Sequence, residues 1–339
     1  MQKFLGMSPD DQRLTFEQTA ARLQMVGSSV EKDFWVCWVL QQLFTMPDLA
    51  QHLTFKGGTS LSKAWQLIDR FSEDIDLTIG RELLGFGGEG SPDQATTSSQ
   101  RGKRLKALKA ACSEFVKTRI HPYLDNAMKN TFGAKGWSLE IDQSDPDQQT
   151  LLFHYPSLIP HAEGRYALPI VKIEFGARSN PWPAHPRNIR PMAAEVFPQV
   201  FENPQTIAQA LAPERTFWEK AMLLHEETYR PEDKPRKERM ARHYYDLYRL
   251  IESGIARKAS ADLKLFEEVA AHRQVFFYQS WVDYSTLRPG TLRLMPVHEA
   301  LWRRDYVAMQ SEMFRKAPPE FATILAAVKA FEQEFNTEN

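Results

Sequence analysis

The stretch FKGGTSLSKAWQLIDRFSEDIDLTIG, from Phe55 to Gly80, constrains the fold more than any other part of the chain. Residues 53–57 form a short apolar segment that ends in glycines and predicts a strand. Residues 59–69 repeat apolar side chains with the period of a helix, and residues 74–79 alternate strictly, which predicts a second strand. We therefore expect a strand, a turn of small residues, a helix, and a second strand beside the first.

The other predicted elements divide the chain into a mixed part and a helical part. The segments WSLEID, QTLLFHY and LPIVKIEFGA predict three more strands, and helices are expected at residues 9–25, 28–46 and 101–131. After NPWPAHPRNIRP the chain turns almost entirely helical. We expect an α+β domain at residues 1–200, with a mixed sheet and flanking helices, and a helical domain at residues 201–339.

Composition favours a cytoplasmic protein of two domains. A length of 339 residues predicts roughly two domains at about 150 residues each. Cys37 and Cys112 are too few for a disulfide framework and fit a reducing compartment. The N-terminus lacks the apolar core of a signal peptide, and the longest apolar run, residues 34–44, is shorter than the roughly 20 residues that cross a bilayer. With a net charge of −1, any nucleic-acid surface must be a local patch.

Two aspartates near the end of the opening stretch predict a metal site. Asp74 and Asp76 stand two positions apart on a strand, so their carboxylates share one face about 7 Å apart. Carboxylates this close repel each other unless a cation lies between them. Mg²⁺ suits such ligands, because one or two carboxylates and the phosphates of a substrate can hold it. The alternative is an ordinary solvated strand face.

The turn that precedes these aspartates predicts a phosphate site. Gly57 and Gly58 allow a backbone to approach a ligand closely, while Thr59 and Ser60 begin a helix whose free N–H groups attract anions. Ser72 stands beside the acids. Taken alone the turn is a helix start. Together with the acidic pair, it favours a site for a metal-bound phosphate.

These motifs resemble those of a known family. KGGTSLSK…RFSEDIDL resembles motif I of nucleotidyltransferases with the DNA-polymerase-β fold, and more narrowly that of the AbiEii/AbiGii toxins, the toxin half of abortive-infection (type IV) toxin–antitoxin pairs. Three later stretches agree in order: VKIEF (171–175), RTFWEKAMLLH (215–225) and RHYYDLYRL (242–250). The resemblance implies a polymerase-β-like nucleotidyltransferase sheet and a toxin that an antitoxin restrains.

The resemblance assigns roles to three residues outside the opening stretch. Glu174 corresponds to a third carboxylate that serves as base or metal ligand, although it can equally be a surface acid, and Lys172 on the same face can pair with an acid instead. Lys220 corresponds to a lysine that supports the triphosphate, against the alternative of a helix-surface lysine. Asp246 orients Lys220 or assists in the cleft; otherwise it joins an ion-pair ladder within its helix.

Two basic stretches are candidates for holding an RNA acceptor. Residues 101–119 carry seven Lys and Arg residues against a single Glu, and residues 230–243 are also rich in Lys and Arg. Such faces bind the nucleic-acid backbone by releasing counterions. They can equally be solvated surface or bind an acidic antitoxin.

The sequence therefore predicts a magnesium-dependent enzyme that transfers NMP from NTP to an acceptor. The resemblance implies that the acceptor is a tRNA end and that the effect is growth arrest. Rival expectations are nucleotidylation of a protein or small molecule, and a binding protein of the same fold without activity. The expected catalytic residues are Asp74, Asp76, Glu174, Lys220 and Asp246; the first two hold the metal, and the nucleotide contacts are Gly57, Gly58, Thr59, Ser60, Ser72 and Lys220.

Overall fold

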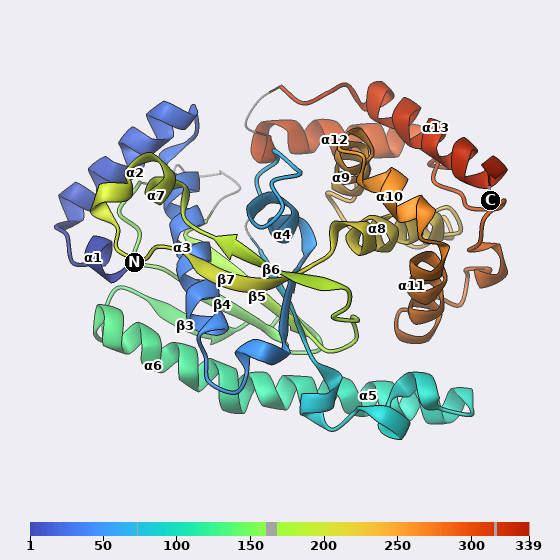
Figure 1. Cartoon of the computed structure of the whole chain (residues 1–339), viewed down its shortest axis with the longest axis horizontal. Coiled ribbons are helices and arrows are strands. Elements are labelled where there is room, and N and C mark those ends of the chain that lie inside the picture. Colours follow the sequence, from blue (N-terminus) through green and yellow to red (C-terminus); the bar gives the residue numbers. More distant parts are fainter. Residues whose placement is uncertain (73, 161–167, 315–316, 339) are drawn as a thin grey trace. The chain divides into compact units, whose positions relative to one another are not determined.

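The computed structural model describes residues 1–72, 74–160, 168–314 and 317–338 (Figure 1). The chain divides into two units, each with its own packing. The first comprises residues 1–64 and 71–210, and the second comprises residues 65–70 and 211–339. The division into an α+β domain at residues 1–200 and a helical domain at residues 201–339 remains our proposal.

A seven-stranded mixed sheet lies in the first unit, in the order β3-β4-β5-β2-β1-β7-β6. Strand β2 runs antiparallel to β1 and parallel to β5, while β7 runs parallel to β1. The expected α+β class with a mixed sheet is thereby confirmed. The strands are β1 (Leu53–Lys56), β2 (Ile75–Ile79), β3 (Ser138–Ile141), β4 (Thr150–His154), β5 (Ile170–Gly176), β6 (Ala184–Ile189) and β7 (Thr206–Leu211).

Alternate residues of a strand point to the same face of the sheet, and on one face these residues are apolar and buried. Helix α3 (Gly27–Phe44) covers part of this face, and the ring of its Trp38 lies 6.0 Å from that of Phe153 on β4. Helices α5 (Ser98–Phe115) and α6 (His121–Phe132) run below the sheet in Figure 1, joined by one π-helical turn. The opposite face stays polar. Helices α1 (Gln2–Leu5), α2 (Pro9–Leu23) and α7 (Met192–Val196) complete this unit.

Helix α4 (Gly57–Lys63) is shorter than the helix expected at residues 59–69. The periodic side chain of Trp65 belongs instead to the second unit, where its Nε1 donates a hydrogen bond to the carbonyl oxygen of Leu211 at 3.0 Å. Gln66 then adopts a left-handed backbone with φ of 56°, which a continuing helix does not allow. The apolar period was therefore correct as a sign of burial and wrong as a sign of helix length.

The second unit is helical, as the sequence predicted. Trp218 on the first of its helices lies at the centre of the core, with its ring 4.8 Å from that of Phe266 and 5.0 Å from that of Phe335. Across the described part of the chain, no helix is both long enough and apolar enough to cross a bilayer. The helices are α8 (Pro213–Glu227), α9 (Arg242–Glu252), α10 (Ile255–Ala261), α11 (Leu263–Phe276), α12 (Glu299–Met313) and α13 (Phe321–Glu338).

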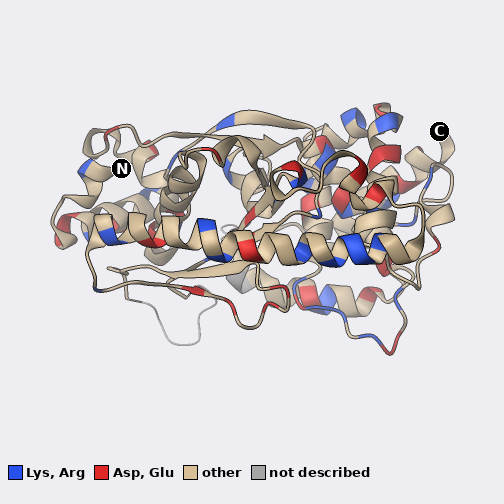
Figure 2. Ribbon diagram, turned by 90° about the horizontal axis from the view of Figure 1, so that it is seen from below, with Lys and Arg blue, Asp and Glu red and all other residues tan. Residues whose placement is uncertain are grey.

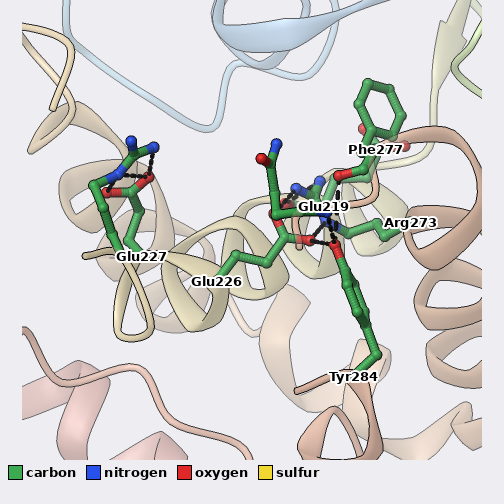
Figure 3. A network of polar contacts seen from close by, with 8 residues as sticks. Glu219, Glu226, Glu227, Arg273, Phe277 and Tyr284 are labelled. Atoms are coloured by element: carbon green, nitrogen blue, oxygen red, sulfur yellow. Dashed lines mark hydrogen bonds and ion pairs between the residues drawn. The ribbon is translucent and has the colours of Figure 1, made fainter. Parts of the chain in front are cut away.

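A buried ion pair ties α11 to α8 (Figure 3). The Nε atom of Arg273 donates to Oε1 of Glu226 at 2.8 Å, and its second nitrogen donates to the other carboxylate oxygen. A further nitrogen of Arg273 donates to the backbone carbonyl of Glu219. Because both charges are buried and hydrogen-bonded, this pair fixes the two helices against each other and leaves the neighbouring residues of α8 in defined positions.

Candidate active site

The turn after β1 requires glycine at its first position. Gly57 has a φ of +78°, which disfavours any side chain. A Cβ atom placed there would lie 1.9 Å from Oδ2 of Asp76, far inside van der Waals contact. The carboxylate of Asp76 therefore lies directly against the backbone of the turn. The pairing of β1 with β2, with Lys56 opposite Asp76, brings the two together.

The hydroxyl of Thr59 anchors the turn to the acidic segment. Its Oγ1 donates to the carbonyl oxygen of Asp74 at 2.5 Å and lies 2.9 Å from Oγ of Ser72. Thr59 and Ser60 are buried. This side chain is thus engaged in positioning the segment that leads into β2. Any phosphate contact from Thr59 has to come from its backbone N–H group, since the hydroxyl proton already has an acceptor.

Glu174 lies beside the aspartates on the polar face of the sheet. Strands β2 and β5 pair in parallel with Asp76 opposite Glu174. The carboxylate of Glu174 forms an ion pair of 2.8 Å with Nζ of Lys172. Burial opposes the charge on Lys172, but hydrogen bonding to Glu174 and the charges of Glu174, Asp74 and Asp142 outweigh it and raise the lysine pKa. Glu174 therefore lies next to Asp76 across the strand pair, and Lys172 pairs with it, as the sequence allowed.

The donor set of this face fits a divalent cation held by two carboxylates. Among the residues that the structure describes, no group of three or more His, Cys, Asp or Glu side chains is placed to hold a metal. Glu174 is engaged with Lys172, so Asp74 and Asp76 are the candidate ligands. Mg²⁺ needs no more protein ligands than these, because water and substrate phosphates complete its octahedral shell. The Asp76 carboxylate lies against the Gly57 turn, so a cation bound to it would lie next to that backbone.

A second polar cluster lies in the second unit, around Asp246 on α9. This side chain is fully buried and accepts hydrogen bonds from Nε and one terminal nitrogen of Arg70, each at 2.7 Å. Its Oδ2 also lies 2.9 Å from Nζ of Lys220 on α8. Burial alone would raise the pKa of Asp246, but the charges of Arg70 and Lys220 outweigh it and lower the pKa. Asp246 is therefore a buried carboxylate that holds two cations.

Lys220 is a buried lysine, which excludes the expectation of an ordinary surface residue. Its pKa is lowered, first by burial and then by the charges of Arg70 and Arg242, against the opposing attraction of Asp246. Nδ1 of His243 lies 3.5 Å from Nζ of Lys220, and burial together with that lysine lowers the histidine pKa well below its ordinary value. His243 is therefore a neutral neighbour of Lys220.

The ion-pair ladder considered for α9 is not formed by Asp246. Its two carboxylate oxygens face Arg70 and Lys220, while Arg249 pairs with Asp69 at 3.0 Å. Arg70 is the residue that sequence reasoning missed. A signal existed, because Arg70 is the basic residue directly before the FSEDID segment, but the sequence did not reveal which acid it meets.

Intramolecular contacts occupy part of both basic stretches. On α5, Arg104 donates to the carbonyl oxygen of Ser91 and Lys109 pairs with Asp147, and on the π-helical turn that follows, Lys117 donates to Gln148. Glu227 takes up both Arg230 and Arg236 of the second stretch. Figure 2 shows basic positions along α5, of which Lys103 and Lys106 are exposed.

Comparison with known proteins identifies the family. No curated protein matches the chain significantly. A solved structure that it resembles is MenT4, a nucleotidyltransferase toxin from Mycobacterium tuberculosis H37Rv, with 17% sequence identity, a TM-score of 0.48, and coverage of 98% of this chain and 90% of that one. The model of the family described as "Nucleotidyl transferase AbiEii toxin, Type IV TA system" matches residues 38–330, most of the chain. The protein therefore belongs to the AbiEii family of nucleotidyltransferase toxins of type IV toxin–antitoxin systems.

Proposed function

We propose that the protein transfers NMP from an NTP to an RNA acceptor, with a tRNA end as the leading candidate, in a magnesium-dependent reaction. An acceptor oxygen attacks the α-phosphorus, the bond from that phosphorus to the bridging oxygen breaks, and pyrophosphate leaves with the electron pair. The observation that carries the proposal is the Asp76 carboxylate against the Gly57 turn, with Asp74 two positions before it. This arrangement brings an acidic pair and the backbone of the small-residue turn together at one point.

The roles within the first unit follow from this geometry. Asp74 and Asp76 would hold Mg²⁺, which when bound neutralises phosphate charge and lowers the pKa of the acceptor. The backbone from Gly57 to Ser60 would contact the triphosphate, while Thr59 and Ser72 keep that backbone next to the acids. Glu174 would act through Lys172 as a neighbouring charge or, once released from it, as the base that accepts the acceptor proton.

We assign Lys220 to the triphosphate and Asp246 to the positioning of Lys220. Their ion pair of 2.9 Å supports the second assignment, and the family resemblance supports the first. Arg70 donates to both carboxylate oxygens of Asp246 and so holds in place the carboxylate that Lys220 contacts. We also propose that the toxin acts in the cytoplasm in abortive infection, restrained by a cognate antitoxin that its toxin–antitoxin family implies.

A protein acceptor is the main alternative to the RNA acceptor in this proposal. Because Arg104, Lys109 and Lys117 are engaged within the chain, α5 offers RNA fewer cations than its sequence promises. This favours keeping a protein acceptor as the second candidate. The deciding experiment incubates the protein with each α-labelled NTP and Mg²⁺, with and without total tRNA. Label appearing on tRNA supports the RNA acceptor. Label on protein alone supports the rival, and no transfer under any condition overturns the proposed function.

A further inference from the structure

A large cavity in the first unit has no role in the site described so far. Its volume is about 840 Å³, within the range of roughly 300–1,000 Å³ that is usual for ligand pockets. Leu53 and Thr54 at the start of β1 and Gln209 within β7 form its floor, and residues of two segments, 80–94 and 180–184, form its walls. All of these residues belong to the first unit.

The cavity lies on the same face of the sheet as the acidic residues. Thr54 contributes to its floor and pairs with Thr78, just as Lys56 pairs with Asp76. Residues two positions apart on a strand share a face about 7 Å apart, so the cavity begins one such step along β2 from Asp76. Along this face the order is therefore cavity, Asp76 and then the Gly57 turn.

The lining offers an aromatic surface and amide groups. Trp182 is 67% exposed, although it is the kind of side chain that proteins usually bury, and Phe86 stands in the opposite wall segment. The backbone N–H of Trp182 donates to Oδ1 of Asn180 at 3.1 Å, which fixes the turn that carries the indole. Gln209 adds a further carboxamide from β7. Aromatic faces with amide hydrogen-bonding groups are how proteins bind unpaired bases.

The charges of the lining disfavour a polyanion inside the cavity. Glu82, Glu89 and Asp93 outnumber the single arginine, Arg81. Phosphates would meet net repulsion here, whereas a neutral planar heterocycle would not. A nucleobase whose own phosphate stays outside, toward the acids, therefore fits the cavity.

We propose that this cavity holds the terminal unpaired base of the RNA acceptor and so presents the acceptor oxygen at Asp76. The inference rests on the proposed function. In phosphoryl-type transfer the attacking and leaving oxygens stand roughly in line across the phosphorus. If pyrophosphate leaves toward the Gly57 turn, the attacking oxygen arrives from the other side of Asp76, which is the side of the cavity. The same geometry assigns the cavity to the acceptor and not to the base of the NTP.

The test replaces the exposed indole and follows the two substrates separately. In Trp182→Ala, the KM for the RNA acceptor should rise about 5- to 100-fold, the range expected from the loss of one base–aromatic stack, while the KM for NTP at saturating acceptor stays the same. Tyr278→Ala is the matched control, because Tyr278 is an aromatic residue that is 60% exposed and does not line the cavity. Gln209→Leu should also raise the KM for RNA, whereas Ile207→Ala on the same strand should not.

A binding readout separates this inference from the proposed catalysis. A short single-stranded RNA that ends in 2-aminopurine should lose fluorescence on binding, because stacking on the indole quenches it, and Trp182→Ala should abolish this quenching. Quenching without any transfer would uphold the cavity and overturn the transferase assignment. Transfer to RNA with unchanged KM in both variants would overturn the assignment of the cavity to the acceptor base and leave the proposed reaction intact. A rise in the KM for NTP instead would assign the cavity to the nucleotide and overturn the inference as well.

Discussion

At the scale of single residues, close contact explains why particular side chains occur where they do. Gly57 is required twice over, by its left-handed backbone and by the carboxylate of Asp76 against it. Gly133 has a similar φ of +72° but open space around it. Comparing the two positions therefore separates the effect of backbone strain from that of a steric clash with Asp76.

Gly57→Ala and Gly133→Ala should therefore differ sharply. Both variants incur a backbone strain of about 1–3 kcal/mol, because an L-residue rarely adopts a positive φ. Only Gly57→Ala also displaces Asp76, so we expect nucleotidyl transfer to fall at least tenfold in this variant and to stay at the wild-type level in Gly133→Ala. Urea unfolding and initial rates measure the two effects. Equal activity in the two variants would show that Asp76 does not need its place against the turn.

Asp246 is buried with Arg70 and Lys220 around it, so we expect its replacement to lower the free energy of unfolding strongly. Asp246→Asn leaves the guanidinium of Arg70 buried without a counter-charge, and losing one partner of a buried pair costs about 3–5 kcal/mol. Asp69→Asn removes the partner of Arg249 in a pair whose aspartate is 67% exposed, so it should cost less than about 1 kcal/mol. Denaturant unfolding compares the two variants. Similar small losses would contradict a structural role for Asp246.

The buried side chain of His225 should make the free energy of unfolding depend on pH. Burial, and then the charge of Arg293, lowers its pKa from 6.5 to about 4. Its Nδ1 accepts a hydrogen bond from the backbone of Arg293, so protonation breaks this contact. Below pH 6.5 the unfolded chain binds a proton that the folded chain does not, and stability therefore falls as the pH drops.

Between pH 6.5 and pH 4 this single histidine should cost about 1.4 kcal/mol per pH unit, or about 3 kcal/mol in all. His225→Asn keeps an acceptor for Arg293 but cannot titrate. Its stability should therefore fall less steeply over this window, although His243, whose pKa is lowered in the same direction, still contributes. Unfolding free energies at pH 4.5, 5.5 and 6.5 measure the slope, and identical slopes in variant and wild type would refute the assignment.

At the scale of elements, α5 presents a smaller basic face than its sequence indicates. Lys103 and Lys106 are exposed, whereas three other basic side chains on the same helical segment have partners within the chain. If this face binds RNA backbone, Lys103→Glu with Lys106→Glu should weaken tRNA binding and lower the salt slope by up to about one unit per lost phosphate contact. Binding measured between 50 and 300 mM salt tests this.

The matched control for α5 reverses Lys258 and Lys264, two exposed lysines of the second unit. That double variant changes the net charge equally but should leave the salt slope as it is. If both double variants weaken binding to the same extent, the effect is one of net charge, and α5 is not the RNA-binding element.

Sequence patterns predicted elements well where the pattern is local. Alternation located β2 and β5, and the small-residue turn placed α4 next to the acids, because strand and turn signals depend on neighbours along the chain. The end of α4 was missed, since Trp65 is held by a hydrogen bond to Leu211, 146 residues away, and Gln66 next to it adopts a positive φ. The engagement of the Thr59 hydroxyl with Asp74 was also invisible to any pattern.

At the scale of the whole molecule, the same distinction applies to the candidate site. The motif around Asp74 and Asp76 is contiguous and could be read directly, as could the order of the later family motifs. Arg70 could not be assigned, because it meets Asp246 across 176 positions and belongs to the second unit, although the segment that follows it, from Phe71 on, belongs to the first. Non-local pairs of this kind are set by packing, which a single sequence does not display.

The proposed magnesium-dependent reaction depends on Asp74 and Asp76 as the metal-binding residues. The most direct test measures NMP transfer against Mg²⁺ concentration for the wild type, Asp76→Asn and Asp74→Asn, with Asp125→Asn on α6 as a control carboxylate. We predict magnesium-dependent transfer in the wild type and the control, and at least a 100-fold loss in both site variants at saturating Mg²⁺, with unfolding free energies unchanged or slightly higher because a carboxylate repulsion is removed. Near-normal turnover in either site variant would contradict the assignment of Asp74 and Asp76 as the metal ligands.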